Sequence, residues 1–432
     1  NSRETPEYPE TPRNLKKLLM KKLIGIFFLL LGAWAPACGQ QSRTCSPDVR
    51  SLQLSVDGDP LLPPVLTLGR HQRLTVEFDE LSHDYHRLLY HVEHCNADWT
   101  PTDGLFESDY LSGFNDQPIE DYENSFNTTQ LYTHYRFSLP NADTRLRLSG
   151  NYRVTVYDDD APETPLLRAE FCLVEPSMTL MAEISGNTDI DFNQSHQQLS
   201  YSVSYGDNRV VDPLRELHTV VMQNRRQDTR VVDLRPNIQK ATGVEFTHRR
   251  ELIFPAGNEF HKFEMLDVEK PGLNIDNVRW YEPYYHVTLY ADQPARNYVY
   301  DEDQDGAFVM RNDNDGSDDA LTSEYVWVHF TMQAPRAEGV GETAPTLRLY
   351  GQWSSAVPAE ETVLTWDEEA RAYTAAAYLK QGYYNYQYLW EDGTSPDGNF
   401  HETENEYIIL VYHRPQGGRY DRLVGYRMFK SR

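Results

Sequence analysis

The amino-acid sequence predicts an all-β protein that contains several β-sandwiches in tandem. Apolar and polar residues alternate with a period of two almost everywhere, as in strands with one buried face, and convincing helical periodicity is almost absent. Tyrosine is frequent, with 29 residues among 432, and aromatic residues favour strands. The length allows two to four domains, each large enough to bury its own core.

The alternation is clearest in four segments. The apolar residues of one face in each are Leu74, Val76 and Phe78; Tyr152, Val154 and Val156; Leu199, Tyr201, Val203 and Tyr205; and Val326, Val328, Phe330 and Met332. Strands separated by turns at these intervals favour β-sandwiches.

Residues 1–39 are expected to direct export rather than to fold. Met20 is followed by two lysines and by an apolar run from Leu23 to Ala37, the pattern of a signal peptide. Since residue 1 is Asn, we expect Met20 to be the true start. The apolar run is shorter than the roughly 20 residues of a transmembrane helix, and no second hydrophobic span follows.

Two processing sites compete at the end of this peptide. Ala35-Pro36-Ala37 matches an ordinary cleavage site, whereas Cys38 could be the lipidated cysteine of a bacterial lipoprotein. The lipoprotein pattern usually has Leu three positions before the cysteine, and this chain has Ala35 there. Both alternatives predict an exported protein.

The charge of the chain disfavours two classes of partner. Lys and Arg total 40 and Asp and Glu total 66, so the net charge is −26. Because phosphate contacts need clustered Lys and Arg, binding to nucleic acid is disfavoured, as is attraction to anionic lipid headgroups.

Changes in composition predict three domains after the signal peptide. We expect an N-terminal β-sandwich over residues 45–176, a middle β-domain over 177–335, a linker at 336–345 that is rich in small residues and proline, and a last β-sandwich over 346–432. The first sandwich carries a long insert, residues 100–127, in which aromatic residues stand among acids. Loops of this length are usually functional or pack as a lid.

No pattern in the chain requires an enzyme. We find no G-x-S-x-G, no H-E-x-x-H and no phosphate-binding loop. With 66 acidic residues, a pair of carboxylates carries no information without geometry.

Two clusters contain metal-ligand residue types. Asp301, Asp303 and Asp305 begin a calcium-loop pattern, but its twelfth position is Asn312 rather than Glu, so a solvated acidic turn is the alternative. The second cluster is His83, His86, His91 and His94 with Cys95. A strand would place His94 on the face opposite to His91 and Cys95, which disfavours a zinc site.

Cys95 and Cys172 both lie in strand-like runs. An oxidising compartment permits a disulfide between them, and free buried thiols are the alternative.

The run Tyr90–Trp99 carries a family resemblance. It contains His94-Cys95-Asn96-Ala97-Asp98-Trp99 and resembles the HCDADW-type strand and turn of the type IX secretion system plug proteins of Bacteroidetes, with Asn96 in place of the first Asp. Further pieces follow in the family's order over about residues 49–413, at 109–114, 121–122, 127–128, 132–135, 149–152, 223–224, 257–260, 300–308 and 379–386. The ordered series makes the resemblance specific.

This resemblance implies a non-enzymatic periplasmic protein without a cofactor, associated with the outer membrane. It would bind the large translocon β-barrel of that membrane and close its periplasmic end. High acidity favours a partner with a basic vestibule. The residues of these motifs and of the insert that could form the interface are His94, Cys95, Asp98, Trp99, Phe106, Asp109, Tyr110, Gly113, Phe114, Tyr122, Asn258 and Glu259. For Asp98 and Trp99 we also expect a structural role in a strand-end turn.

In the last domain, residues 347–353, Tyr373 and residues 379–388 resemble the immunoglobulin-like early-set sandwich, which glycogen-binding modules also use. An envelope carbohydrate-binding protein is therefore the alternative function, with Trp353, Tyr383, Tyr384 and Trp390 as candidates for stacking on sugar. The alternation of Tyr384, Tyr386 and Tyr388 also fits an ordinary core face, and a fold can be shared without its ligand.

Overall fold

The computed structural model describes residues 42–313, 318–336 and 345–432. Strands dominate these residues, and the helices among them are three to five residues long, so the predicted all-β fold is confirmed. The expected signal peptide, Cys38 and most of the expected linker lie outside the described residues. The short helices are α2 (Glu107–Tyr110), α3 (Pro213–Glu216), α4 (Asp319–Thr322), η2 (Gln227–Thr229), η3 (Arg250–Leu252), η4 (Gln352–Ala356) and η5 (Ala359–Thr362).

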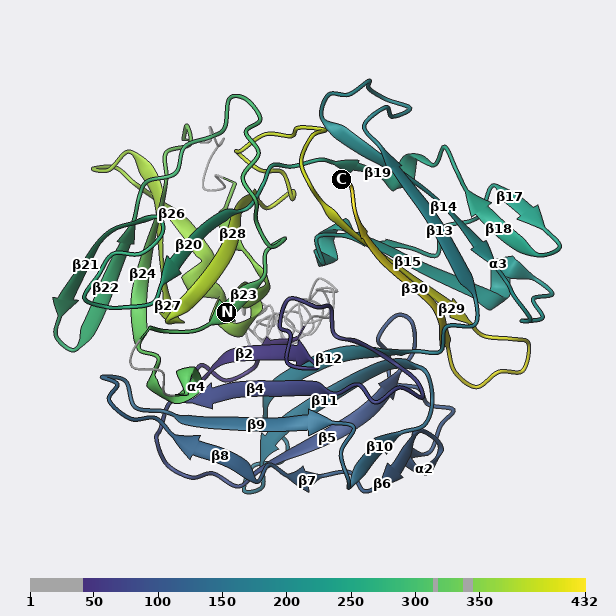
Figure 1. Cartoon of the computed structure of the whole chain (residues 1–432), viewed down its shortest axis with the longest axis horizontal. Helices are drawn as coiled ribbons and strands as arrows, with labels where there is room; N and C mark the ends of the chain where they lie inside the picture. Colours follow the sequence, from purple (N-terminus) through teal and green to yellow (C-terminus); the bar gives the residue numbers. More distant parts are fainter. Residues whose placement is uncertain (1–41, 314–317, 337–344) are drawn as a thin grey trace, which may run out of the picture. The chain divides into compact units, whose positions relative to one another are not determined.

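The first module is a sandwich of two mainly antiparallel sheets (Figure 1). One sheet has the order β1 (Arg43–Thr44), β12 (Pro165–Val174), β11 (Gly150–Asp158), β5 (Leu88–Cys95) and β7 (Gln117–Pro118), with β3 (Val65–Thr67) parallel to β12. The other has the order β2 (Val49–Val56), β4 (Leu74–Glu80), β9 (Thr133–Leu139) and β8 (Asp121–Asn124). A small third sheet pairs β6 (Leu111–Gly113) with β10 (Thr144–Leu146).

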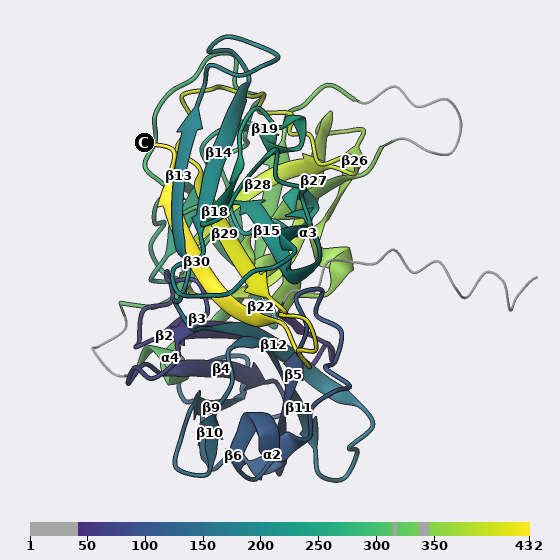
Figure 2. The same cartoon turned by 90° about the vertical axis from the view of Figure 1, so that its right-hand side faces the viewer.

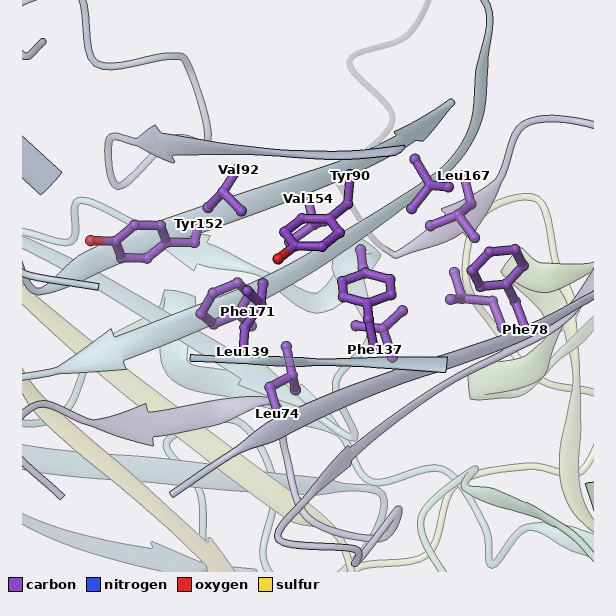
Figure 3. Close-up of a cluster of buried hydrophobic side chains, with 14 of the residues drawn as sticks. Leu74, Phe78, Tyr90, Val92, Phe137, Leu139, Tyr152, Val154, Leu167 and Phe171 are labelled. Carbon is purple, nitrogen blue, oxygen red and sulfur yellow. The ribbon is translucent and has the colours of Figure 1, made fainter. Parts of the chain in front are cut away.

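The core of the first module confirms the period-two pattern. Leu74, Val76 and Phe78 of β4 are fully buried, and the residues between them are half-buried. Across the sandwich, the rings of Tyr90 and Phe137 stack with their centroids 4.7 Å apart (Figure 3). Stacked aromatic pairs contribute beyond the apolar area that they bury.

The second module is also a sandwich of two sheets. One has the order β13 (Thr179–Ser185), β14 (His196–Ser204), β18 (Gly243–Phe246) and β17 (Ile238–Lys240), with β19 (Ile253–Pro255) paired to β14. The other has the order β16 (Val231–Val232), β15 (Leu217–Gln223), β29 (Glu406–His413) and β30 (Arg422–Lys430). Tyr201, Phe246 and Tyr407 lie in the core between them.

The third module is built on a nine-stranded sheet. Its order is β20 (His261–Met265), β28 (Gly382–Trp390), β25 (Leu347–Tyr350), β26 (Val363–Asp367), β27 (Ala372–Lys380), β24 (Tyr325–Met332), β22 (Tyr284–Leu289) and β21 (Ile275–Tyr281), and β23 (Phe308–Met310) also pairs with β28. Its core contains Phe263, Phe330 and Trp353.

Strand pairing does not follow the expected order of a middle domain over 177–335 and a last domain over 346–432. β15 pairs with β29, from Leu217 opposite His413 to Gln223 opposite Tyr407, and β24 pairs with β27. In Figure 2 the yellow strands β29 and β30 accordingly lie beside the teal strands β13–β15. The third module therefore interrupts the second between β19 and β29.

The burial of β29 explains why this strand joins the second module. All eight of its residues are buried, so the strand needs neighbours at both edges and on both faces. Composition reports local changes along the chain and carries no information on which distant strand fills those positions.

Candidate interaction surface

His94, the first residue of the HCNADW motif, is buried at the end of β5. Its Nε2 donates to the carbonyl oxygen of Ser149 at 3.1 Å, and its Nδ1 lies 2.9 Å from the hydroxyl of Thr102. Burial lowers the pKa of His94. No space remains beside the ring, since a Cβ on Gly150 would lie 2.5 Å from Nε2. This histidine supports the fold.

The two buried cysteines are free thiols. Cys95 of β5 and Cys172 of β12 both lie opposite Asn151 of β11, one on each side. Two strand spacings separate their Cα atoms by about 10 Å, beyond the reach of a disulfide. Burial raises the pKa of each thiol to about 12, so neither has the thiolate character of a reactive cysteine.

The rest of the HCNADW motif forms the junction between the first and second modules. The N–H of Ala97 donates to Asp421 at 2.9 Å, and Arg414 donates to the side-chain oxygen of Asn96 at 2.6 Å. Asp421 and Arg414 belong to the segment between β29 and β30. The motif therefore joins two parts of this chain that are more than 300 residues apart.

Asp98 and Trp99 shape this turn. Asp98 accepts from the N–H of Thr100 at 3.0 Å and from its hydroxyl at 2.6 Å. Trp99 has a positive φ of 65°, and its half-buried indole packs against a cluster that includes Tyr412 and Leu423. These contacts give both residues a structural part in the junction.

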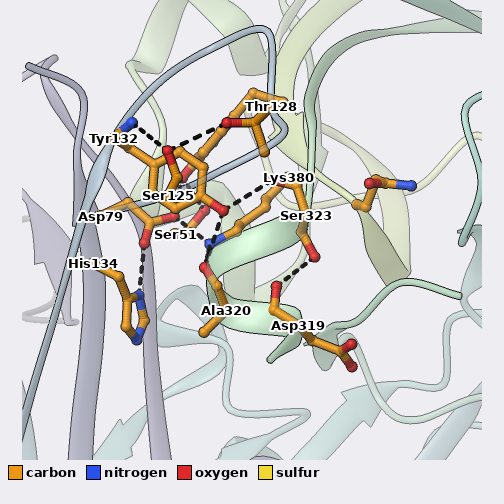
Figure 4. A network of polar contacts seen from close by, with 12 residues as sticks. Ser51, Asp79, Ser125, Thr128, Tyr132, His134, Asp319, Ala320, Ser323 and Lys380 are labelled. Carbon is orange, nitrogen blue, oxygen red and sulfur yellow. Dashed lines mark hydrogen bonds and ion pairs between the residues drawn. The ribbon is translucent and has the colours of Figure 1, made fainter. Parts of the chain in front are cut away.

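A buried ion pair joins the first and third modules (Figure 4). Lys380 of β27 lies 2.7 Å from Asp79 of β4, and their side chains are 0% and 1% exposed. Asp79 also accepts from Tyr325 and from His134, each at 2.7 Å. Lys380 makes a second bond, to the carbonyl oxygen of Ala320 at 2.6 Å.

The electrostatics of this pair follow from its depth. Burial by itself would raise the pKa of Asp79, but the ammonium of Lys380 and the bond from His134 outweigh it and lower that pKa. Burial lowers the pKa of Lys380, against the opposing effect of Asp79. Both His134 and Lys380 lie in motifs that carry the family resemblance, and here they hold two modules together.

Glu259 and the acidic turn meet where the second and third modules join. Glu259 accepts from the hydroxyl of Tyr298 at 2.5 Å and from the N–H of Glu404 at 3.3 Å. Burial raises the pKa of Glu259. Asn258 is half-buried, and its carbonyl oxygen accepts from Gln387 at 3.1 Å.

The three calcium candidates face different partners. Asp301 pairs with Lys262, Asp303 accepts from the N–H groups of Phe260 and Asp305, and Asp305 pairs with Lys430. The four histidines are likewise dispersed: His83 contacts Ser125, His86 contacts Asp158, His91 contacts Asp116, and His94 contacts Ser149. Among the described residues, no group of three or more His, Cys, Asp and Glu is placed to hold a metal ion.

Two of the sugar-stacking candidates lie in the core of the third module. Trp353 is 1% exposed and donates its indole N–H to the carbonyl oxygen of Asn385 at 2.9 Å. Tyr384 is 2% exposed and stacks on Phe263. Tyr383 and Trp390 are half-buried. Because stacking on sugar needs exposed ring faces, Trp353 and Tyr384 cannot form such a platform.

The aromatic insert divides into buried and exposed residues. Tyr110 packs against His94 and Tyr152 in the first module. Tyr122 contacts the exposed ring of Tyr85, with centroids 4.5 Å apart. Phe106 and Phe114 are 77% and 76% exposed, and they are the best interaction candidates among the predicted residues.

Arg225 is a key residue that sequence reasoning missed. It makes a bidentate pair with Glu406 in the second module, at 2.8 and 2.9 Å. It also donates to the carbonyl oxygen of Leu61 in the first module at 2.7 Å and to Gln352 in the third at 3.4 Å. Residues 223–224, next to Arg225 in the chain, matched a family motif, and this neighbourhood was the only feature of the sequence that pointed to Arg225.

Fold and site together define a class of protein, a scaffold of three β-modules joined by polar contacts. Residues of the family-like motifs lie at the junctions between its modules, and the insert of the first module exposes aromatic side chains. Among the described residues, no helix is long and apolar enough to cross a membrane.

The comparisons identify the family within this class. Residues 49–175 match the family described as "Type 9 secretion system plug protein 1st domain". A crystal structure of a hypothetical protein from Parabacteroides merdae is similar over 90% of this chain and 99% of that chain, with 37% identity and a TM-score of 0.84. A search of curated proteins found no match. The chain belongs to the type 9 secretion system plug protein family, and membership suggests a place in the cell envelope beside the secretion machinery.

Proposed function

We propose that this protein is a non-enzymatic plug that binds the outer-membrane translocon barrel of the type 9 secretion system and closes its periplasmic end. The observation that carries the proposal is the match of the first module, residues 49–175, to the plug family. This module also carries the exposed insert.

The build of the molecule supports this function. A plug must keep its shape against a wide opening, and polar contacts such as Asp79–Lys380 and Arg225–Leu61 join the modules. A net charge of −26 favours a partner with a basic vestibule and makes association sensitive to salt.

Binding is tested by affinity purification. A C-terminally tagged protein is recovered from detergent-solubilised envelopes of its native host, with an unrelated tagged periplasmic protein as the control. We expect mass spectrometry to find one very large barrel protein, in amounts that fall as salt rises. Recovery of no barrel, while other envelope complexes stay intact, would contradict the proposal.

Closure is tested separately from binding. Cells that lack this protein should admit large antibiotics such as vancomycin through open barrels, and removal of the barrel as well should restore the exclusion. Unchanged permeability in the single deletion would leave a binding protein that does not close the pore.

A further inference from the structure

The chain crosses between the second and third modules twice, and the two crossings touch. The first crossing, residues 256–260, joins β19 to β20, and the second, residues 391–405, joins β28 to β29. The N–H of Phe400 in the second crossing donates to the carbonyl oxygen of Gly257 in the first at 2.9 Å. Because these crossings connect the two modules covalently, a movement of one module relative to the other must bend them.

The loop between β22 and β23 of the third module packs on the first crossing through Asp303. One carboxylate oxygen of Asp303 accepts from the N–H of Phe260 in the crossing. The other accepts from the N–H of Asp305 within the loop, at 2.8 Å. Asp303 therefore ties the loop of the third module to the segment that leads back to the second.

Three buried carboxyl groups gather at this contact. Glu259, Asp303 and Asp305 are 9%, 8% and 4% exposed. Burial is the main reason that the pKa of Asp303 is raised to about 7, and the charges of Asp305 and Glu259 act in the same direction. Asp303 thus changes its protonation near neutral pH at the place where the modules are joined.

The cations around the contact are paired with other acids. The pairs are Lys430 of β30 with Asp305 and Glu404, Lys262 of β20 with Asp301, and Arg225 of the second module with Glu406. Arg432 lies over the rings of Tyr298 and Tyr300. On the side of β28, burial and, to a smaller extent, the charge of Asp303 raise the pKa of Tyr383.

Ionisation of Asp303 therefore adds a buried negative charge beside Asp305 and Glu259, with the nearby cations already engaged. Separation of the loop from the crossing returns these carboxylates to water and relieves both the repulsion and the cost of burial. The protonated form of Asp303 carries no such penalty, so protonation favours the closed contact.

We infer that the contact of Asp303 with the first crossing is a pH-sensitive joint between the second and third modules, closed while Asp303 is protonated and released when it ionises. The joint goes beyond the proposed function, because its opening does not involve the barrel. It gives the scaffold one place where the third module can move without unfolding.

Hydrogen–deuterium exchange of the full chain at single residues, corrected for the intrinsic rate, measures the opening at pH 6 and pH 8. The amides of Phe260 and Asp305 report on the joint, since each donates to Asp303. The amide of Val154 in the buried strand β11 reports on global unfolding. We expect the two joint amides to be less protected than Val154 at both pH values.

The pH dependence follows from the proton that the closed joint retains. A pKa of about 7 in the closed joint and one near 3.9 in the open joint make opening about tenfold more favourable at pH 8 than at pH 6. The protection of Phe260 and Asp305 should therefore fall about tenfold between these pH values.

Two matched variants assign the effect to one carboxyl. D303N keeps the size of the side chain and removes its titration, so the protection of Phe260 should become the same at pH 6 and pH 8. D301N is the control, because Asp301 lies two residues away and its side chain is 64% exposed; it should keep the tenfold change. A tenfold change that persists in D303N, or joint amides as protected as Val154 at both pH values, would overturn the inference and leave the plug function untouched.

Discussion

Replacement of Lys380 by methionine tests the buried pair between the first and third modules. Methionine has nearly the same length, so the change removes the ammonium and little packing volume. Asp79 then stays 1% exposed with hydrogen bonds from His134 and Tyr325 but without its cation.

The expected loss follows from the burial of the pair. Removal of one partner of a buried ion pair lowers stability by about 3–5 kcal/mol, because the other charge remains uncompensated. The unit Gln41–Arg432 has an unfolding entropy of roughly 0.8 kcal/mol per kelvin by its length. A loss of ~4 kcal/mol therefore lowers the melting temperature by about 5 °C.

The assay is thermal unfolding of a double-mutant cycle, K380M, D79N and the double variant. The double variant removes both charges and should recover most of the loss. K270M is the control, because Lys270 pairs with Asp267 on an exposed turn and its side chain is 79% exposed. We expect no change in the melting temperature of this variant. A shift below 1 °C for K380M, or a double variant as unstable as the sum of the two single variants, would refute the coupling.

Acid pH should reproduce part of this effect. Because the pKa of Asp79 is lowered in the fold, its stabilisation is present above its ordinary value near 3.9 and is lost as pH falls through the folded pKa. D79N should therefore lose less stability than wild type between pH 5 and pH 2. Parallel curves for the two proteins would show that Asp79 makes no such contribution.

Three further predictions concern other contacts. R225K should lower the free energy of unfolding, measured in urea, by about 2–4 kcal/mol, since lysine cannot reproduce the bidentate pair with Glu406. The control R215K changes a side chain that is 86% exposed and should leave urea unfolding unchanged. Equal free energies of unfolding for the two variants would exclude a stabilising role for Arg225. Burial raises the pKa of Asp303 to about 7, so stability should decline as pH rises from about 4 to 7. D303N should flatten that decline by on the order of 4 kcal/mol; an unaltered pH profile in D303N would contradict a raised pKa at Asp303. G150A should lower the free energy of unfolding by about 2–4 kcal/mol, because the new Cβ would overlap His94 and the φ is 141°. G58A, with a φ of 84° and open space around it, should lower it by about 1–2 kcal/mol from backbone strain alone. Equal losses in the two variants would rule out the overlap with His94.

Sequence reasoning succeeded where local pattern decides structure. The alternation of Leu74, Val76 and Phe78 specified a strand with one buried face, because successive side chains of a strand point to opposite faces. For Tyr384, Tyr386 and Tyr388 the alternation left a core face and a sugar-binding face open, and the structure buries all three side chains. The ordered motifs predicted the plug family, which the match at residues 49–175 confirms.

The candidate surface could be narrowed to the insert but not resolved within it. Phe106, Tyr110 and Phe114 look alike in sequence, as aromatic residues among acids. Tyr110 is buried because His94 and Tyr152 receive its ring, and nothing local to the insert reports that. The same limit applied to Trp353, whose partner Asn385 is 32 residues away.

The sequence by itself determined the all-β class and the family, since strand periodicity and motif order are written along the chain. Only the tertiary structure decided that β29 completes the second module, that Lys380 neutralises Asp79 across 301 residues, and that Phe106 and Phe114 remain exposed. Burial and charge pairing depend on contacts between segments far apart in the chain, and those contacts exist only once the modules have packed against each other.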